Sequence, residues 1–285
     1  TKINMPSVLE IIQKSSEFLS ARGVESARLN AELLIGHALE LKRMQLYLQF
    51  ERALSEAELE KVRPLVIRRG NREPLQHIVG ETEFLDLKLK VDKRALIPRH
   101  ETEYLIELIT PRLAVAPVRI LDLGTGSGAI ALALAKIYPQ AAVTAVDQSE
   151  TALTLARENA AACGLSGRVS FILADWFSAL TAQDQFQLIV ANPPYLTDEE
   201  TQATEPEVKD FEPAMALSAG KNGAAALKKI IRSARTHLAS GGLLACETGI
   251  TQHAELQELA ATLGYERLES LQDLTGRDRY LLAFR

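Results

Sequence analysis

The residues with the clearest chemical use are Asn192, Pro193, Pro194 and Tyr195, which follow an apolar run at 186–191. This order is typical of a buried parallel strand that ends in a rigid loop. Neither proline has an N–H to extend a sheet, and each restrains the residue before it. The loop should therefore present two fixed acceptors, the Asn192 amide and the Pro193 carbonyl, beside the flat ring of Tyr195. Such a pair can hold a planar amide or an aromatic amino group by its N–H bonds, with one face of the nitrogen free to react.

A glycine-rich segment follows an earlier predicted strand, 118–123, and precedes a predicted helix, 129–136. Its residues are Gly124, Thr125, Gly126, Ser127 and Gly128. Glycine lets the backbone approach a ligand where a Cβ would clash. The spacing is one residue shorter than the G-x-G-x-x-G fingerprint of dinucleotide sites. With Asp122 two residues before the first glycine, it is typical of S-adenosylmethionine sites, where a carboxylate suits a ligand that carries an ammonium and a sulfonium.

Three further residues stand at the ends of the next two predicted strands, Asp147 at one and Asp175 with Trp176 at the other. We expect Asp147 to accept hydrogen bonds from two ribose hydroxyls. Trp176 should flank an adenine, and Asp175 should accept from the adenine amino group. Ligands of a doubly wound sheet lie outside the carboxyl ends of its strands. All these residues and Asn192 should therefore meet in one crevice, with Asn192 bordering both S-adenosylmethionine and the substrate.

The elements that must position these residues alternate between strand and helix from residue 118 onward. Further helices are predicted over 149–162, 223–238 and 251–263, and further strands over 142–146, 169–173, 242–247, 265–271 and 279–284. Such alternation predicts a largely parallel sheet with helices on both faces. The fold class is therefore α/β, a doubly wound, mostly parallel seven-stranded sheet of the class I S-adenosylmethionine methyltransferase type.

The first hundred residues have another pattern. Apolar residues recur at helical spacing from 7 to about 70, and Pro64 should kink or split the third helix. Alternation over 84–91 predicts a strand or hairpin. We therefore expect a small helical domain at 1–75, a hairpin linker at 76–103 and a methyltransferase catalytic domain at 104–285. The helical domain serves either substrate recognition or stability alone.

Composition narrows the range of partners. The chain has 285 residues, a net charge of −5, a pI of about 5.7 and two cysteines, Cys163 and Cys246. An acidic chain is not suited to binding nucleic acid or an acidic membrane over a wide surface. The cysteines lack metal-type spacing, so we predict no metal site and a reduced, cytoplasmic protein. No apolar run approaches the ~20 residues of a membrane span.

Several motifs together resemble one known family, the release-factor glutamine N5-methyltransferases of the HemK/PrmC type. They lie at 72–76, 80–84, 96–103, 122–128, 175–176, 192–195, 211–213 and 247–249. His77 and His100 depart from the pattern, where tyrosine and proline are expected. The resemblance implies N5-methylation of the glutamine in the Gly-Gly-Gln motif of bacterial class I peptide-chain release factors. It also implies that Asn192 and the Pro193 carbonyl hold that glutamine, and that the front domain and hairpin grip the release factor.

Other readings of the same residues remain open. Adenine presents the same amino geometry, so a DNA adenine N6-methyltransferase is one alternative, although such an enzyme must contact phosphates and flip a base. A second alternative methylates a glutamine of another protein or a small amine. A third is a non-catalytic module that only binds S-adenosylmethionine. The acidic stretch 197–210 is either a mobile solvated loop or a lid that orders over a basic partner.

Overall fold

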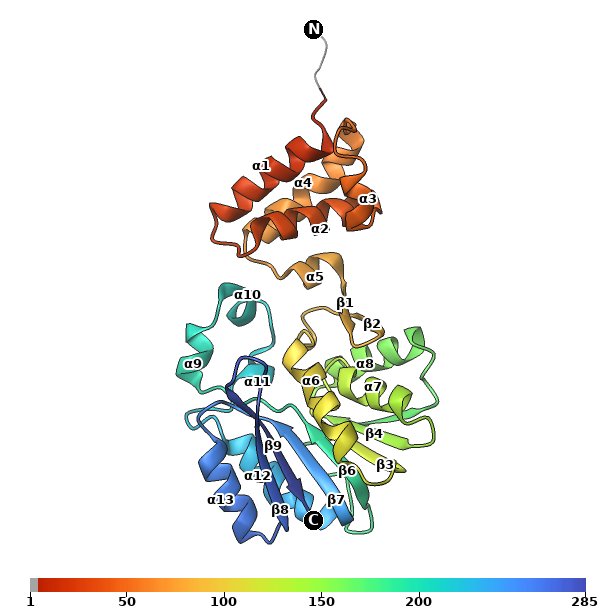
Figure 1. Cartoon of the computed structure of the whole chain (residues 1–285), viewed down its shortest axis with the longest axis vertical. Helices are drawn as coiled ribbons and strands as arrows, with labels where there is room; N and C mark the ends of the chain where they lie inside the picture. Colours follow the sequence, from red (N-terminus) through yellow and green to blue (C-terminus); the bar gives the residue numbers. More distant parts are fainter. Residues whose placement is uncertain (1–4) are drawn as a thin grey trace. The chain divides into compact units, whose positions relative to one another are not determined.

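The structure is a computed structural model that describes residues 5–285. The chain forms two compact units, whose helices and strands are drawn in Figure 1. One unit contains the described residues up to Gly80 together with Glu205–Phe211, and the other contains Glu81–Thr204 and Glu212–Arg285. Each unit has a hydrophobic core of its own.

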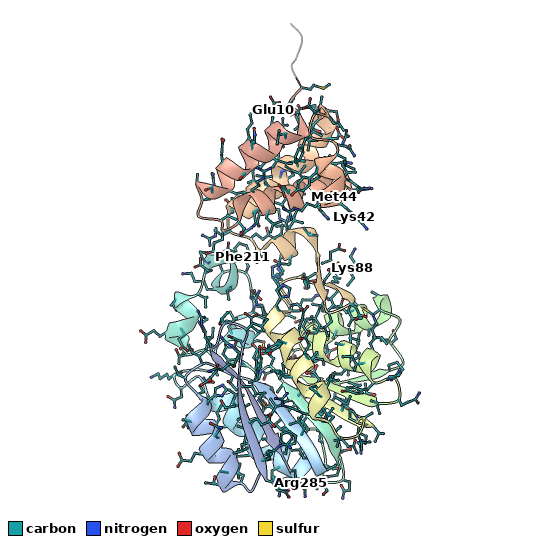
Figure 2. The ribbon with its side chains drawn as sticks, in the orientation of Figure 1. Glu10, Lys42, Met44, Lys88, Phe211 and Arg285 are labelled. Atoms are coloured by element: carbon teal, nitrogen blue, oxygen red, sulfur yellow. The ribbon has the colours of Figure 1, made fainter. Side chains whose placement is uncertain are left out.

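The first unit is helical. Its helices are α1 (Val8–Ser20), α2 (Ala27–Leu39), α3 (Arg43–Tyr47), α4 (Glu56–Gly70), α5 (Leu75–Val79) and α10 (Pro206–Lys209). Ser7 and Ser55 begin α1 and α4 with capping boxes, in which side chain and backbone satisfy each other's free groups. Apolar side chains of α1, α2 and α4 meet in the core, where Ile12 and Leu34 are fully buried. The side chains that fill both units are drawn in Figure 2.

A kink or a split of the helix is expected at Pro64, and the structure contradicts the split, because α4 continues through Pro64. A proline removes one hydrogen bond to the carbonyl four residues earlier, here that of Glu60. Both residues are exposed, so water can donate to the free carbonyl. Leu59, Val62 and Val66 on the opposite side keep α4 packed on the core.

A short segment from much later in the chain, Glu205–Phe211, packs with this helical unit. Glu207 accepts hydrogen bonds from Arg69 Nη2 at 2.9 Å and from Arg72 Nη2 at 2.6 Å. Arg69 is only 6% exposed, and its Nε donates to Asn30 Oδ1 at 2.8 Å. Because an unpaired charge at a buried position is strongly destabilising, these partners hold the segment firmly.

The acidic stretch 197–210 is largely helical in the structure. It contains α10 and a second short helix, α9 (Asp198–Ala203), which Thr197 and Glu200 begin with a capping box. Glu200 accepts from the Thr197 N–H at the start of α9, and Glu205 and Glu207 pair with arginines.

The second unit is built on a seven-stranded sheet with the order β5-β4-β3-β6-β7-β9-β8. Its strands are β3 (Arg119–Leu123), β4 (Ala142–Asp147), β5 (Val169–Leu173), β6 (Phe186–Ala191), β7 (Leu238–Glu247), β8 (Arg267–Gln272) and β9 (Asp278–Phe284). The five strands from β5 to β7 in this order run parallel, and β9 is antiparallel to both its neighbours. The predicted mostly parallel seven-stranded sheet is confirmed.

Helices cover both faces of this sheet (Figure 1). One face carries α6 (His100–Ile109), α7 (Ala129–Ile137) and α8 (Glu150–Ala162), and the other carries α12 (Ala225–His237) and α13 (His253–Thr262). Successive strand residues such as Ile120 and Leu121 enter opposite cores, as the two-residue period requires. The same unit contains the short helices η1 (Thr110–Arg112), α9 and α11 (Ala214–Leu217). Among the described residues, no helix has the length and apolarity needed to cross a membrane.

The predicted hairpin consists of β1 (Glu81–Phe84) and β2 (Leu87–Lys90), which pair antiparallel. Phe84 and Leu89 are fully buried in the core under α6 and α7. Asn159 of α8 accepts from the Lys90 N–H at 2.7 Å and donates to the Lys90 carbonyl at 3.0 Å and to the Ser127 carbonyl at 2.9 Å. The hairpin is thus fastened to the glycine segment that follows β3.

Candidate active site

The strand order reverses at β3, which has β4 on one side and β6 on the other. The connections that leave β4 and β6 therefore diverge, and a crevice opens at their carboxyl ends. The glycine segment 124–128 follows β3, Asp147 is the last residue of β4, and Asn192 follows β6. Convergence of the predicted residues is a consequence of this topology.

The glycine segment turns from β3 into α7. Gly124, Gly126 and Gly128 have φ values of 70°, 55° and 86°, in the region that L side chains rarely adopt. A Cβ on Gly128 would lie 3.1 Å from Cβ of Ala156, and one on Gly124 would lie 3.3 Å from the Trp176 ring. The backbone therefore follows a path that other residues could not, and it leaves the space above the turn open to a ligand.

Asp122 lies beneath the turn and holds it in place. Its Oδ2 accepts from Thr125 Oγ1 at 2.6 Å and from the Ala131 N–H at 3.1 Å. The side chain is fully buried, and this burial raises the pKa of Asp122 to about 7. Asp122 is not among the described residues that line the cavity. Its carboxyl thus secures the start of α7, and the interpretation of Asp122 as a partner of the ligand's positive charge is not supported by its position.

Asp147 ends β4 with its carboxylate held by the backbone. Oδ2 accepts from the Gly126 N–H and Oδ1 from the Ser149 N–H, both at 2.9 Å. Burial raises the pKa of Asp147, and these N–H groups act in the opposite direction. A carboxylate has about four lone-pair sites. Two remain after these bonds, which matches the two neighbouring hydroxyls of a ribose.

Asp175 and Trp176 follow β5 on the same side of the crevice. Asp175 is exposed, and its Oδ2 accepts from Lys229 Nζ at 2.6 Å. Trp176 has a φ of 52°, an uncommon value for a bulky residue, and its ring lies against Gly124. The flat ring is thus fixed over the glycine turn, where an aromatic base could stack.

Asn192 and the residues behind it form a chain of hydrogen bonds. Asn192 Nδ2 donates to Thr102 Oγ1 at 3.0 Å, and Thr102 Oγ1 donates to Glu247 Oε2 at 2.7 Å. The Tyr195 hydroxyl donates to the other oxygen of Glu247 at 3.0 Å. Burial and the negative charge of Glu247 raise the pKa of Tyr195, so its phenol stays neutral. The loop after β6 is therefore fixed to α6 and to the end of β7.

The remaining wall of the cavity comes from two loops joined by one buried carboxylate. Glu212 Oε2 accepts from the Ile97 N–H at 2.9 Å, and Oε1 pairs with Arg99. Leu96 precedes Ile97, and Met215 follows Glu212 by three residues. Both side chains line the cavity. Apolar side chains here can cover a ligand and exclude water.

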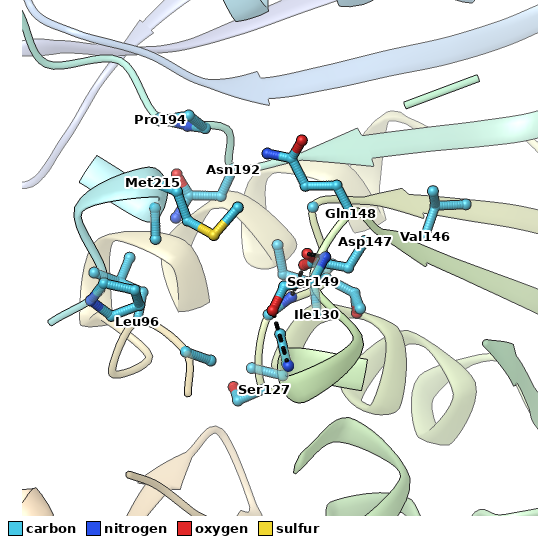
Figure 3. Close-up of a pocket in the computed structure, with 18 of the residues that line it drawn as sticks. Leu96, Ser127, Ile130, Val146, Asp147, Gln148, Ser149, Asn192, Pro194 and Met215 are labelled. Carbon is cyan, nitrogen blue, oxygen red and sulfur yellow. Dashed lines mark hydrogen bonds between the residues drawn. The ribbon is translucent and has the colours of Figure 1, made fainter. Parts of the chain in front are cut away.

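The cavity has roughly 940 Å³ of empty space, counting the part open to solvent. Figure 3 shows Asn192, Pro194 and Met215 on one side and Asp147 and Ser149 on the other. The predicted residues that line it are Gly124, Thr125, Gly126, Ser127, Asp147, Asp175, Trp176, Asn192 and Pro194.

Three predicted residues are not among the described lining residues: Gly128, Pro193 and Tyr195. Gly128 lies at the start of α7, next to Ala156. Pro193 is buried, and Tyr195 turns its hydroxyl toward Glu247. The direct contacts expected of these three residues stay predictions.

Sequence reasoning did not assign site roles to Thr102, Glu212 or Glu247, although they lie within the motifs of the family resemblance. Glu247 carried a signal that could have been used, because it is an acid at the carboxyl end of a buried strand, as Asp147 is. Thr102 and Glu212 lie in a helix and a loop without such a signal.

Two family models match parts of the chain. Residues 10–80 match the family model described as the PrmC N-terminal domain, and residues 115–279 match a methyltransferase domain. The chain is 40% identical to the release factor glutamine methyltransferase of Geobacter sulfurreducens, over 96% of this chain and 95% of that protein. A relative of the same name from Chlorobaculum tepidum is also 40% identical, over 96% of each chain. The chain belongs to the release factor glutamine methyltransferase family.

As a release factor glutamine methyltransferase, the chain is an enzyme that uses S-adenosylmethionine as its methyl donor, as predicted. Solved structures support the fold alone. The hMettl16 catalytic domain has a TM-score of 0.56 at 18% identity, over 77% of this chain and 81% of its own. A methyltransferase from Pyrococcus furiosus has a TM-score of 0.53 at 19% identity, over 70% and 89% of the two chains.

Three observations indicate that the cavity can hold S-adenosylmethionine. The turn at Gly124 and Gly126 has no Cβ to fill the space, Asp147 keeps two lone pairs, and Trp176 offers a fixed flat surface. All three lie on the walls of one cavity that Asn192 also lines.

Proposed function

We propose that the chain methylates the side-chain nitrogen N5 of the glutamine in the Gly-Gly-Gln motif of bacterial class I peptide-chain release factors. The names of the relatives support this substrate. The observation that carries the proposal is the fixed Asn192 amide at the edge of the cavity, with its nitrogen bound to Thr102. Its oxygen is thereby free to accept from a primary amide.

The residues that would hold the donor are those on the β4 and β5 side of the cavity. Asp147 would accept hydrogen bonds from the ribose hydroxyls, and the backbone at 124–127 would lie along the ligand. Trp176 would flank the adenine, and Asp175 would accept from its amino group. When bound, S-adenosylmethionine supplies an electrophilic methyl group on its sulfonium. Leu96 and Met215 exclude water from the same space.

The role of Asn192 and Pro193 is to align the glutamine. Their oxygens accept the two N–H bonds of its amide, so that the nitrogen is fixed with one face open. An amide nitrogen is a weak nucleophile, and positioning can contribute roughly 7–11 kcal/mol. The same acceptors favour the partly positive nitrogen of the transition state. The proton can leave to water afterwards, so no strong general base is required, and the neutral Tyr195 is not one.

The helical unit is proposed to recognise the release factor, with the boundaries 1–75, 76–103 and 104–285 as the working division of the chain. Pro194 and Tyr195 are proposed to flank the glutamine, and Gly128 to complete the donor's turn. The cytoplasm is the proposed location, because release factors act there. The DNA adenine and non-catalytic alternatives are not favoured, since the relatives are named for glutamine methylation.

One assay tests this proposal. The enzyme is incubated with methyl-labelled S-adenosylmethionine and, in turn, a release factor, the same factor with the motif glutamine changed to alanine, and duplex DNA. Label should enter only the unmodified release factor, and peptide mass analysis should place it on that glutamine. Equal labelling of the alanine variant, or labelling of DNA alone, would overturn the proposal.

A further inference from the structure

The hydrogen bonds behind Asn192 end on a buried carboxylate. Glu247, the last residue of β7, is 1% exposed, and Thr102 of α6 is 4% exposed. Glu247 receives the Thr102 hydroxyl on one oxygen and the Tyr195 hydroxyl on the other. Asn192 joins this group through Thr102. Four side chains from three separate parts of the second unit thus form one connected chain.

The number of hydrogens in this chain fixes its direction. An ionised carboxylate can only accept, and a hydroxyl has a single hydrogen to donate. In the structure Thr102 donates its hydrogen to Glu247 and accepts from Asn192 Nδ2, and while Glu247 is ionised this is the arrangement that the hydrogens allow. The group of Asn192 that faces Thr102 must be the NH2. The amide oxygen is then left on the other side, toward the cavity.

We propose that Glu247 and Thr102 are positioning residues, which set the end of the Asn192 amide that faces the substrate. This inference rests on the function proposed above, since it concerns how Asn192 accepts from the glutamine amide. With the amide reversed, its NH2 would meet the N–H bonds of the substrate, donor against donor. Glu247 touches neither ligand directly in this scheme and acts through Thr102.

The substitution Glu247→Gln removes the constraint with little change in shape. A glutamine at this position can donate to Thr102, which can then donate to the Asn192 oxygen. Both orientations of Asn192 become allowed, and only one of them binds substrate. Protonation of Glu247 has the same effect, so activity should fall on acidification and this limb should be absent from the Gln variant.

The groups around Glu247 come from each element packed on it. They are Thr102 and Glu101 from α6, Tyr195 from the loop after β6, and Arg279 and Tyr280 from β9. Arg279 favours the ionised carboxylate, while burial and Glu101 disfavour it. Burial has the larger effect and raises the pKa of Glu247, so this carboxylate takes up a proton at a higher pH than a free glutamate does.

The test compares Thr102→Val, Thr102→Ser and Glu247→Gln with the unchanged enzyme. Valine keeps the shape and removes the hydroxyl, whereas serine keeps the hydroxyl. We expect kcat to fall by about 10-fold or more in Thr102→Val and Glu247→Gln. The decrease should be smaller than the roughly 100-fold decrease expected when a group that stabilises the transition state is removed outright. The Kd for S-adenosylmethionine should stay within about twofold, and Thr102→Ser should recover most of the activity.

A matched control is Tyr265→Phe, which removes another buried hydroxyl, bound to the Ile231 carbonyl at 2.7 Å away from the cavity lining. It should leave kcat unchanged. If Thr102→Val is as active as the unchanged enzyme, or if Thr102→Ser is as poor as Thr102→Val, the inference is wrong. Retention of the acidic limb in Glu247→Gln also counts against it. An unchanged enzyme that does not label the release factor would instead contradict the proposed function.

Discussion

Replacing Asp147 with alanine should weaken the binding of S-adenosylmethionine by about 100-fold or more. Its carboxylate is fixed by the N–H groups of Gly126 and Ser149 and keeps two lone pairs for the ribose. Hydrogen bonds to a charged group contribute about 1.5–3 kcal/mol each, so two of them give about 3 kcal/mol at the least. Because 1.4 kcal/mol corresponds to a factor of ten, the expected rise in Kd is on the order of 100-fold.

The variant Asp147→Asn separates chemistry from size. Gly126 and Ser149 each donate to a different oxygen of Asp147. An asparagine must set its NH2 against one of these N–H groups, so it also disturbs the glycine turn. We therefore expect Asp147→Asn to bind the donor almost as poorly as Asp147→Ala. Asp184→Asn is the control, because Asp184 caps Thr181 and pairs with Arg119 but is not among the described lining residues.

Isothermal titration calorimetry measures these Kd values, and a thermal melt of each variant shows that the protein is folded at the titration temperature. The melt matters because two partly buried N–H groups, those of Gly126 and Ser149, lose their acceptor in the alanine variant. A Kd within about threefold of the unchanged enzyme for either Asp147 variant would refute the role given to this carboxylate.

Three further predictions follow from the same contacts. Asn192→Ala should lower turnover of the release factor by at least about 100-fold while the Kd for S-adenosylmethionine rises less, as measured by labelled-methyl transfer and calorimetry; comparable turnover would contradict its role. Burial raises the pKa of Asp122 from 3.8 to about 7, so the stability from its neutral form is fully present below about pH 4 and is lost as the pH rises through about 7. Between pH 5 and pH 8 this loss should amount to roughly 2–3 kcal/mol in denaturant unfolding of the ligand-free protein, and it should be absent from Asp122→Asn. Glu207→Gln should weaken the pairing with buried Arg69 and speed amide hydrogen exchange in Glu205–Phe211 by roughly 10-fold. Glu56→Gln, which alters an exposed pair, is the control. An equal acceleration of amide exchange in this variant would show that the burial of Arg69 is irrelevant.

Much of the site could be predicted because its residues lie at the ends of strands, which local sequence patterns reveal. The point at which an apolar run stops predicts where a buried strand ends. In a parallel sheet the carboxyl ends of the strands, which here precede or carry Asp147, Trp176 and Asn192, lie at one edge. The glycine turn is also local, since its positive φ values need glycine whatever surrounds it. Pro64 shows the limit of local rules, because its place on the exposed side of α4 decided that the helix continues.

The sequence by itself therefore determined the α/β class, the glycine turn after β3 and the position of Asn192 after β6. Only the tertiary structure decided what holds these parts. Thr102 and Glu247 are 145 positions apart, and Asn192 and Thr102 are 90 apart, yet they share one chain of hydrogen bonds. Arg69 and Glu207 are joined across 138 positions. Such pairs leave no periodic or spacing signal, because the packing of distant elements, and not the neighbours in sequence, brings each donor to its acceptor.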